Sequence, residues 1–556
     1  MASDTISFTF DGRTVAARPG QSLAAALTEA GQRTFRDTVK GAERGMFCGM
    51  GVCQDCLVTV DGLPNQRACM TTAREGLAVA RQAALATLGQ ASASEPGVAQ
   101  TIAPDVLVVG GGAGGLSAAI EAAAAGASVT VLDERKVGGG QFYKQAAAGG
   151  EPLDEQQAEG AELLRRATAA GVEIVKGAEV WGAFDGPVLM ADVGGAALVA
   201  RPKTLIVATG AYERPRMVPG WTLPGVMTTG AAQTLWRSYR SLAGRRVAIC
   251  GSGPLNLQVA GELARGGAKV VMVAEAAPSP LARPLAGLAL LAAGPALAAK
   301  GMAMLAELRA KGVAIRFGTS LQRVEKEGDG LRAFFAADGR AFDVAVDALC
   351  MNEGFEPQNE ILRLLGAKMR YDPAFGHLRC VRGETMATSV ANVFAVGDCA
   401  GLGGAPAARV EGGIAGRAAA ATVGRGVAEA SEPDRRELAA HRAFQTRLWS
   451  LYRPAPRASS EIADETIVCR CEEITAGEIR GALRSDPAHV GTVKRATRVG
   501  MGRCQGRYCG PVAVRLLAET RGAAIEDTSH FAPRVPIKPV AISSIVAAGA
   551  ALDGQD

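Results

Sequence analysis

Hydrophobic and polar positions alternate at the start of the chain. Residues 6–17, ISFTFDGRTVAA, predict two short strands joined at Asp11-Gly12, a dipeptide that tolerates the positive φ angles of a two-residue hairpin turn. The next segment, PGQSLAAALTEAG, predicts a helix that is capped by Ser22 and ends at Gly31. A second strand pair is expected in LVTVDGL, so the chain opens with a small domain of strands around one helix.

The longer middle part of the chain has a different pattern. From residue 104 to about 425, short apolar runs alternate with helical patterns and glycine turns, which predicts a doubly wound α/β domain. Residues 81–103 lack aromatic residues and predict a linker, and a second linker is expected near 425–463. We therefore predict an N-terminal domain at 1–95, a central domain at 104–425 whose inner nucleotide-binding half covers about 240–350, and a small helical domain at 463–530.

One stretch is more apolar than the rest. Residues 285–299, LAGLALLAAGPALAA, carry no charge over fifteen positions, fewer than the about 20 that a helix needs to cross a bilayer. The pattern predicts a helical hairpin buried against a domain or a partner, with peripheral membrane contact as the alternative. No transmembrane segment is expected.

Composition narrows the class of protein. A chain of 556 residues is too long for one hydrophobic core, and its 70 glycines indicate many tight turns near ligands. The net charge of +5 includes no run of like charges, so nucleic acid is not an expected partner. The first residues lack an export signal, and we expect a cytoplasmic location, where the two clusters among the 12 cysteines indicate metal sites rather than disulfides.

The first cysteine cluster has the spacing C-x4-C-x2-C-x12-C, formed by Cys48, Cys53, Cys56 and Cys69. This is the plant-type [2Fe-2S] spacing, and the glycines between the first two cysteines allow the loop to curl around two irons. Zinc is the alternative metal, although zinc sites usually pair two C-x2-C motifs. A redox-active disulfide between the first two cysteines is a weaker alternative.

A dinucleotide fingerprint follows at 105–134. It combines a buried strand, the glycines of G-x-G-x-x-G, a helix and a second strand, which together place a pyrophosphate at a helix N-terminus and a carboxylate near a ribose. The candidate residues are Gly110, Gly112, Ala113, Gly115, Asp133 and Glu134. Because the fingerprint recognises only an ADP moiety, FAD is the favoured ligand, and NAD or ATP stays open as an alternative.

A second copy of the fingerprint runs from 245 to 275. Gly251 and Gly253 are present, but Asn256 stands where the third glycine is expected. A side chain there obstructs close packing of helix on strand, so either the turn is reshaped or nicotinamide binding has been lost. We expect this copy to be structural, and NAD(P) binding stays open.

The second cysteine cluster is formed by Cys469, Cys471, Cys504 and Cys509 with the spacing C-x-C-x32-C-x4-C. It resembles the bacterioferritin-associated-ferredoxin type of [2Fe-2S] domain, in which each cysteine pair caps a helix. Zinc held by four thiolates is the alternative.

Two later segments carry a further resemblance. Ala208-Thr209-Gly210 after a strand, and Gly397-Asp398 in NVFAVGDCAG, together resemble the FAD-dependent pyridine-nucleotide reductase family. The resemblance implies that Asp398 meets the flavin ribityl chain and that Gly140 and Gln141 line the flavin site. It implies a fold of three parts: a β-grasp ferredoxin-like module, a doubly wound FAD/NAD(P)-binding domain and a small helical [2Fe-2S] module.

The order of these modules resembles the α subunits of multi-subunit amine and amino-acid dehydrogenases, such as opine oxidases, hydroxyproline dehydrogenases, hydrogen cyanide synthase and heterotetrameric sarcosine oxidase. The resemblance implies that the ferredoxin module is fused to this chain. It also implies a D-amino-acid-oxidase-like flavoprotein β subunit that oxidises a C–N bond, an FMN at the interface between the two subunits, and a quinone or electron carrier as the acceptor.

The residues agree with a chain that has no substrate site. The four histidines, His377, His441, His489 and His530, are scattered, and no acid–base constellation is visible, so no catalytic residue is predicted here. Two other functions stay open: a stand-alone NAD(P)H:acceptor oxidoreductase that passes electrons from FAD to the clusters, and a non-catalytic iron–sulfur scaffold or redox sensor.

Overall fold

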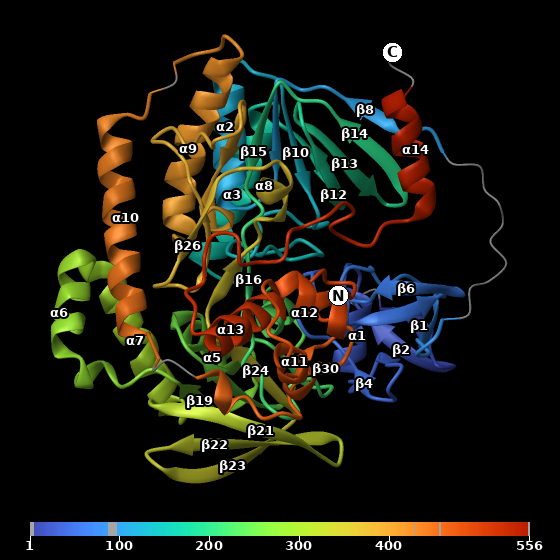
Figure 1. Cartoon of the computed structure of the whole chain (residues 1–556), viewed down its shortest axis with the longest axis vertical. Helices are drawn as coiled ribbons and strands as arrows, with labels where there is room; N and C mark the ends of the chain where they lie inside the picture. Colours follow the sequence, from blue (N-terminus) through green and yellow to red (C-terminus); the bar gives the residue numbers. More distant parts are fainter. Residues whose placement is uncertain (1–4, 87–96, 428, 455–457, 554–556) are drawn as a thin grey trace.

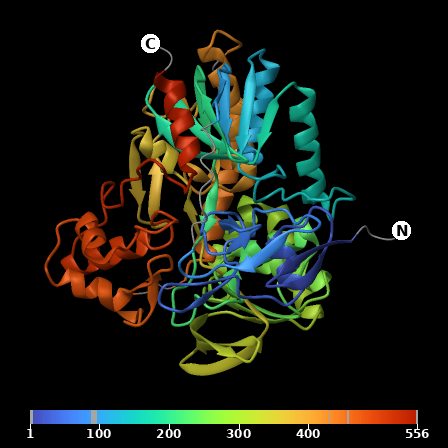
Figure 2. The same ribbon diagram turned by 90° about the vertical axis from the view of Figure 1, so that its right-hand side faces the viewer.

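A computed structural model describes residues 5–86, 97–427, 429–454 and 458–553. In Figure 1 the N-terminal strands and the C-terminal helices α11–α13 lie below the central sheet that contains β9, β10 and β15. Figure 2 gives the same arrangement from the side, with these two parts against the lower half of the molecule. The predicted three-part α/β fold is confirmed.

The N-terminal part is a β-grasp sheet with one helix across it. Its strand order is β2-β1-β7-β5-β6. The predicted hairpin turn is confirmed, because Asp11 and Gly12 have φ angles of 48° and 76° and Phe10 pairs with Arg13. Ser22 caps the helix through a hydrogen bond from the Ala25 N–H. The elements are β1 (Ile6–Phe10), β2 (Arg13–Ala17), α1 (Leu23–Glu29), β3 (Arg36–Asp37), β4 (Glu43–Arg44), β5 (Leu57–Val60), β6 (Leu63–Arg67) and β7 (Ala78–Arg81).

The first half of the central domain is a parallel sheet of order β11-β10-β9-β15-β28, with α2 packed against α3 and α9. A second sheet, β12-β13-β14-β8, lies beside it. The elements are β8 (Gln100–Ile102), β9 (Val106–Val109), α2 (Ala113–Ala124), β10 (Val129–Asp133), α3 (Glu155–Ala169), β11 (Glu173–Lys176), β12 (Ala178–Phe184), β13 (Val188–Val193), β14 (Ala196–Ala200), β15 (Thr204–Val207), β28 (Val393–Ala395), η2 (Gly397–Cys399) and α9 (Gly404–Thr422).

The second half repeats the pattern with the parallel order β17-β24-β18-β19-β20. The antiparallel ribbon β21-β22-β23 follows it, and two strand pairs, β16-β25 and β26-β27, join the halves. The elements are β16 (Ala211–Glu213), β17 (Val226–Thr228), α4 (Thr229–Tyr239), β18 (Arg246–Gly251), α5 (Pro254–Arg265), β19 (Lys269–Glu275), η1 (Pro280–Ala282), α6 (Pro284–Ala293), α7 (Pro295–Ala310), β20 (Ala314–Arg316), β21 (Thr319–Glu327), β22 (Gly330–Ala337), β23 (Arg340–Val346), β24 (Ala348–Asn352), β25 (Phe355–Pro357), α8 (Glu360–Leu364), β26 (Met369–Asp372) and β27 (His377–Cys380).

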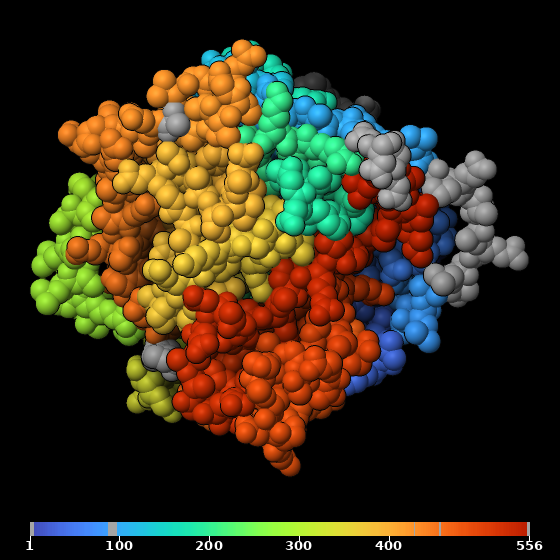
Figure 3. Space-filling model, turned by 45° about the horizontal axis from the view of Figure 1, so that its top comes forward, coloured from blue at the N-terminus to red at the C-terminus, as the bar shows by residue number. Residues whose placement is uncertain are grey.

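The C-terminal part is helical and then returns to the central domain. Thr475 and Glu478 form a capping box at the start of α11, as the sequence predicts for ITAGEI. After α13 the chain crosses the molecular surface, where Figure 3 shows the red segment lying against teal and yellow parts of the central domain, and α14 packs on β14. The elements are α10 (Glu432–Leu451), η3 (Ser459–Glu461), β29 (Ile467–Cys469), β30 (Ile474–Thr475), α11 (Ala476–Leu483), α12 (Val490–Thr497), α13 (Gly510–Arg521) and α14 (Ile542–Asp553).

The linker predicted at 425–463 is wrong over most of its length. The helix α10 occupies 432–451, runs down the left edge of Figure 1 and packs on α9 and α6. It starts at a capping box formed by Ser431 and Asp434 and buries Leu438 and Leu451. Pro433 lies in the first turn, where proline does not break a helix. Of the other predicted linker, the boundary near 95 falls at 87–96, outside the described residues.

The predicted helical hairpin at 285–299 is confirmed as α6 and α7, but it is not buried against this chain, and its burial against a partner stays a prediction. Leu285 is 81% exposed, Leu288 is 63% exposed and Met302 is 66% exposed. Among the residues described in α6, only Leu290 is fully buried. No helix in the described ranges is both long and apolar enough to cross a membrane.

Candidate flavin and iron-sulfur sites

A cavity of about 460 Å³ lies at the carboxyl ends of the first parallel sheet. Every predicted dinucleotide residue except Gly115 lines it, so the tertiary structure brings together segments that are far apart in the sequence. These residues are Gly110, Gly112, Ala113, Asp133, Glu134, Gly140, Gln141, Ala208, Thr209, Gly210, Gly397 and Asp398. Ligands of doubly wound sheets bind at this edge.

The first glycine turn has the close contacts that its motif requires. Gly110 has a φ of 110°, and a Cβ at Gly115 would lie 1.9 Å from the Gly110 carbonyl oxygen. The third glycine therefore packs the helix on the turn and does not face the cavity. A Cβ at Gly140 would lie 2.8 Å from the Gly112 Cα, so two loops meet with no room for side chains. The N-terminus of α2 is left open to a pyrophosphate.

Asp133 ends β10 and is 6% exposed. Its Oδ1 accepts a hydrogen bond from the Arg135 N–H at 3.1 Å, while Oδ2 has no hydrogen-bond partner among the described residues. Burial raises the pKa of this carboxyl to about 6. A buried acceptor without a partner at the cavity wall fits a ribose hydroxyl.

Glu134 differs from its neighbour because it is already paired. Arg67 lies 3.3 Å from Oε1 and Lys538 contacts Oε2. Burial opposes ionisation, but these two cations keep the pKa of Glu134 below its ordinary value. Its carboxylate therefore joins the N-terminal part and the C-terminal segment to the rim of the cavity.

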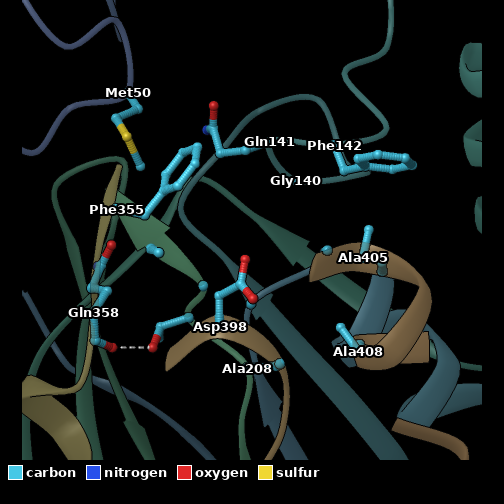
Figure 4. A pocket seen from close by; sticks show the side chains of 18 of the residues that line it. Met50, Gly140, Gln141, Phe142, Ala208, Phe355, Gln358, Asp398, Ala405 and Ala408 are labelled. Atoms are coloured by element: carbon cyan, nitrogen blue, oxygen red, sulfur yellow. Dashed lines mark hydrogen bonds between the residues drawn. The ribbon is translucent and has the colours of Figure 1, made fainter. Parts of the chain in front are cut away.

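Asp398 points into the cavity from the short helix η2, which precedes α9, as Figure 4 shows. Its Oδ1 accepts hydrogen bonds from the N–H groups of Gly403 and Gly404, both at 2.9 Å. Burial raises the pKa of this carboxyl. On the opposite wall, the Thr209 hydroxyl donates to the Gln358 carbonyl oxygen at 2.5 Å.

Met50 and Phe355 also line the cavity, and sequence reasoning missed both (Figure 4). Met50 lies on the loop between Cys48 and Cys53, so the first cysteine loop forms part of the cavity wall. No local pattern marks such a contact, because it depends on how the N-terminal part docks on the central domain.

The thiols of the first cluster lie in two pairs. Cys48 lies beside Cys53, whose N–H donates to the Cys48 Sγ at 3.3 Å, and Cys69 lies beside Cys56. All four are free, buried thiols. Burial by itself raises the pKa of Cys48, but the bonds from Cys53 and from the Met50, Cys53 and Val52 N–H groups lower it to about 7. Gly51, with a φ of 80°, supplies the turn that the spacing predicts.

The second cluster repeats this arrangement. Cys469 pairs with Cys509 and Cys471 pairs with Cys504. The bond from Cys471 and the charge of Arg507 lower the pKa of Cys504 to about 6, against the effect of burial. Cys509 is the N-cap of α13, as predicted, whereas α11 is capped by Thr475 instead of by a cysteine.

The pairing of the thiols bears on which metal the loops fit. In a [2Fe-2S] cluster each iron takes two cysteines, whereas zinc gathers its ligands around one ion. Two neighbouring pairs of buried thiols in each set match the two cysteines that each iron takes.

The second glycine turn is closed by the chain itself. The Gly253 N–H donates to Glu275 at 3.0 Å, and the Ser252 hydroxyl oxygen lies 2.6 Å from both Glu275 Oε1 and the Tyr452 carbonyl oxygen, to one of which it donates its hydrogen. The Trp449 ring covers Gly253, lying 3.5 Å from the position of a Cβ on that glycine. Glu275, Trp449 and Tyr452 thus cover the second glycine turn, while Pro254, Leu255 and Gln258 at the start of α5 line the same cavity as the first turn.

Asn256 fits into this reshaped turn. It is 1% exposed, its Oδ1 accepts from the Thr229 hydroxyl at 2.8 Å, and its Nδ2 donates to the Asn352 carbonyl oxygen at 3.2 Å. The side chain that was expected to obstruct packing instead joins α5 to two neighbouring elements.

Comparison with known proteins agrees with this architecture. The model of the pyridine nucleotide-disulphide oxidoreductase family matches residues 104–420. The chain belongs to this family. A 2Fe-2S iron-sulfur cluster binding domain matches 3–84, and a BFD-like [2Fe-2S] binding domain matches 467–519. The chain is therefore a flavin-dependent oxidoreductase with two [2Fe-2S] domains.

Curated relatives of this oxidoreductase include an opine oxidase subunit of Rhizobium meliloti (strain 1021), which is 34% identical over 79% of this chain and 98% of that protein. Hydrogen cyanide synthase subunit HcnB of Pseudomonas aeruginosa is 32% identical over 79% of this chain and 97% of that protein. The HcnA protein of the same synthase and organism is 44% identical over 69 residues, 12% of this chain and 66% of that protein.

Among solved structures, L-proline dehydrogenase from P. horikoshii superposes with a TM-score of 0.73 at 19% identity, over 98% of each chain. At this identity the match shows a shared fold.

Proposed function

We propose that this chain is the electron-transferring α subunit of a dehydrogenase or oxidase that oxidises the C–N bond of an amino acid, opine or other secondary amine on a partner β subunit. The observation that carries the proposal is the second glycine turn, where the Gly253 N–H is already bonded to Glu275 and the end of α10 covers the turn. With these contacts in place, electrons would reach the flavin from a partner and not from NAD(P)H at this turn.

The names of the relatives support the same function. The opine oxidase chain and HcnB of hydrogen cyanide synthase are both named as subunits, and both align over nearly their whole length. Because HcnA resembles a 69-residue stretch and HcnB a much longer part, we infer that two chains of that synthase correspond to one fused chain here. The fused parts correspond to the domains predicted at 1–95, 104–425 and 463–530.

We assign the cofactors to the residues described above. FAD would lie in the cavity with its pyrophosphate at the N-terminus of α2, a ribose at Asp133 and its ribityl chain at Asp398. Bound FAD exchanges electrons in pairs with an organic donor and singly with iron–sulfur clusters. The clusters would be held by Cys48, Cys53, Cys56 and Cys69 and by Cys469, Cys471, Cys504 and Cys509.

The protein contributes insulation and orientation. Seven of these cysteines are buried and Cys471 is half-buried, which keeps water away from the metal sulfur bonds and raises the influence of nearby charges. The glycine turns keep side chains out of the cavity, so that backbone N–H groups can approach a pyrophosphate.

The partner that we infer is a D-amino-acid-oxidase-like flavoprotein, with an FMN at the interface and a quinone or another electron carrier as the final acceptor.

We further infer a cytoplasmic location with peripheral contact to the inner face of the membrane. The exposed leucines of the α6–α7 hairpin support that contact. Flotation with liposomes tests it, and Leu285→Ser together with Leu288→Ser should abolish co-flotation.

The test of the function is an anaerobic titration of the purified chain, with iron, sulfide and flavin quantified on the same sample. NADH should leave the flavin and cluster absorbance unchanged, dithionite should bleach both, and an opine or amino acid should bleach them only when the β subunit is added. Rapid bleaching by NADH would overturn the proposal in favour of an NAD(P)H:acceptor oxidoreductase. Failure of every amine to reduce the reconstituted complex would favour a scaffold or sensor.

A further inference from the structure

The two cysteine loops, which are more than 400 residues apart in sequence, meet through aromatic rings. Phe47 directly precedes Cys48, and Tyr508 directly precedes Cys509. Their ring centroids are 5.6 Å apart at an interplanar angle of 71°, and the two residues are 0% and 6% exposed. Trp221 packs on the other side of Phe47 at 5.6 Å. The rings form a dry contact between the segments that carry the two sets of thiols.

A buried ion pair joins the same two loops. Asp55 lies between Cys53 and Cys56, and Arg470 lies between Cys469 and Cys471. Arg470 Nη2 is 2.5 Å from Asp55 Oδ2, and the two side chains are 5% and 2% exposed. The guanidinium also lies 4.0 Å from the centroid of Phe47. One arginine therefore contacts the acid and the ring of the facing cysteine loop.

Stability does not explain this pair well. Burying two charges costs desolvation that their attraction barely offsets, and apolar residues of similar size often serve as well. Asp55 carries a second buried partner, since Arg36 Nη2 is 2.6 Å from its Oδ1. What the ions add is a fixed geometry and a defined charge beside each set of thiols, both of which tune an iron–sulfur cluster.

The first cysteine loop also faces the flavin cavity. Met50, between Cys48 and Cys53, lines that cavity (Figure 4). Cys48 and Cys53 belong to the same hydrophobic core as Cys469, Cys504 and Cys509, whereas Cys56 and Cys69 belong to another core, which joins the N-terminal part to the second half of the central domain. The pair Cys48–Cys53 is thus next to the cavity and also packed towards the second cluster.

We propose that the cluster held by the first loop is the middle carrier between the flavin cavity and the second cluster, and that Asp55 and Arg470 are the positioning residues that keep the two loops in electronic contact. Electron tunnelling falls steeply with distance, so packed rings and a locked ion pair favour this path. Each step would move one electron: a reduced flavin anion would give up two electrons, one for each cluster reduced, and would release one proton to solvent, while each cluster takes its electron without a bond being broken. The proposal rests on the proposed function in one respect, because both require the two clusters. It requires neither an amine substrate nor a partner subunit.

The first test uses the whole chain with flavin and both clusters, reduced by dithionite and studied by electron paramagnetic resonance. In the parent chain the two reduced clusters should show a spin–spin interaction. The double variant Asp55→Asn, Arg470→Gln removes both charges while keeping similar shapes, and it should weaken the interaction and shift both cluster potentials at unchanged iron and sulfide content. The variant Arg44→Gln, Glu473→Gln removes another buried pair between the same two parts and serves as the matched control, which should keep the interaction.

The second test asks for the order of carriers. Light with EDTA reduces the bound flavin directly, so neither an amine nor a partner is involved. In Cys69→Ser, which lacks one ligand of the first cluster, light should reduce the flavin but no longer the second cluster, which dithionite still reduces.

Reduction of the second cluster by light at the parental rate in this variant would overturn the proposed order. An interaction that survives in the Asp55, Arg470 double variant at parental strength would overturn the positioning role. If Cys69→Ser also loses its flavin, the rate at which light reduces the second cluster is measured in the Asp55, Arg470 double variant instead. A rate below the parental one supports the proposed path, and a parental rate overturns it. If no amine reduces the reconstituted complex, the outcome of both tests stays the same, and only the proposed function is contradicted.

Discussion

The Gly253 N–H donates to the Glu275 carboxylate at 3.0 Å, in a turn whose sequence otherwise matches a dinucleotide fingerprint. In an open turn of this kind the same N–H faces the phosphate of the nucleotide. Here the protein supplies its own anion, and the Tyr452 carbonyl oxygen lies 2.6 Å from the Ser252 hydroxyl oxygen beside it. The two fingerprints therefore differ: the glycines of the first turn line the cavity, whereas Gly253 of the second turn is covered by other side chains of the protein.

The first prediction concerns ligand binding at these two turns. FAD added to flavin-depleted chain should raise the melting temperature, because a ligand that binds only the folded state stabilises it by mass action. NADH and NAD⁺ should leave the melting temperature unchanged, since the second turn is filled. The measurement is thermal unfolding with each nucleotide at equal concentration. If NADH raises the melting temperature of the parent chain but not that of Gly253→Trp, the second turn opens to the nucleotide and the prediction is wrong.

The second prediction is a pH dependence of stability that originates at Glu275. Burial raises the pKa of this carboxyl from 4.5 to about 7, so the folded chain binds its proton more tightly than the unfolded chain does. The free energy of unfolding should therefore fall by about 3 kcal/mol between pH 4.5 and pH 7 and stay at the lower value above that range.

Glu275→Gln should lack this fall, because an amide does not titrate. The quantity to compare is the change in melting temperature of parent and variant between pH 5 and pH 8. Glu162→Gln on the surface of α3 is the control and should follow the parent. Parallel curves for parent and Glu275→Gln would contradict the prediction.

The third prediction concerns Asp133, whose Oδ2 faces the cavity without a partner in the described part of the chain. Asp133→Ala should weaken FAD binding by roughly 10- to 100-fold, because it removes a hydrogen bond to a charged acceptor. Such a bond contributes about 1.5 to 3 kcal/mol. Quenching of flavin fluorescence measures the affinity. Asp105→Asn, at the other end of β9, is the control and should bind FAD as the parent does.

The fourth prediction compares two glycines. Gly115→Ala should cost more than about 2 kcal/mol of stability and release FAD, because the added Cβ would overlap the Gly110 carbonyl oxygen. Gly301→Ala, in α7, meets nothing within 4 Å and should stabilise the chain by about 0.5 to 1 kcal/mol through helix propensity. Urea unfolding of both variants measures the two changes in the free energy of unfolding. A similar loss of stability in both variants would contradict the prediction.

The fifth prediction separates metal ligands from other cysteines. Cys504→Ser should lose the second cluster and about half of the bound iron, since each [2Fe-2S] cluster holds two irons. Cys399→Ser should keep all of the iron, because its thiol already donates to the Val207 and Val396 carbonyl oxygens, a role that a hydroxyl can take. Iron and sulfide analysis with visible absorbance gives the result, and iron loss in Cys399→Ser alone would overturn the ligand assignment.

Local patterns predicted a large part of this molecule. The hairpin turn at Asp11-Gly12, the capped helices that begin after Ser22 and Thr475, and the first glycine turn each depend on residues a few positions apart. Steric limits on φ and the hydrogen bonds of a helix end act over that range, so they can be seen without a fold.

Other features depended on contacts between distant segments. The helix α10 was predicted as a linker, because its polar composition hides the few apolar residues that pack on α9 and α6. The role of Met50, the closure of the second turn by Glu275 and Tyr452, and the pair Asp55–Arg470 all join segments that no spacing rule connects.

The sequence by itself thus determined which residues are able to hold a dinucleotide and two clusters, because glycine conformation and thiol spacing are local constraints. Only the tertiary structure decided which of the two fingerprints stays open and how the clusters face each other. Those outcomes follow from the docking of whole domains, where burial and charge pairing are summed over residues hundreds of positions apart.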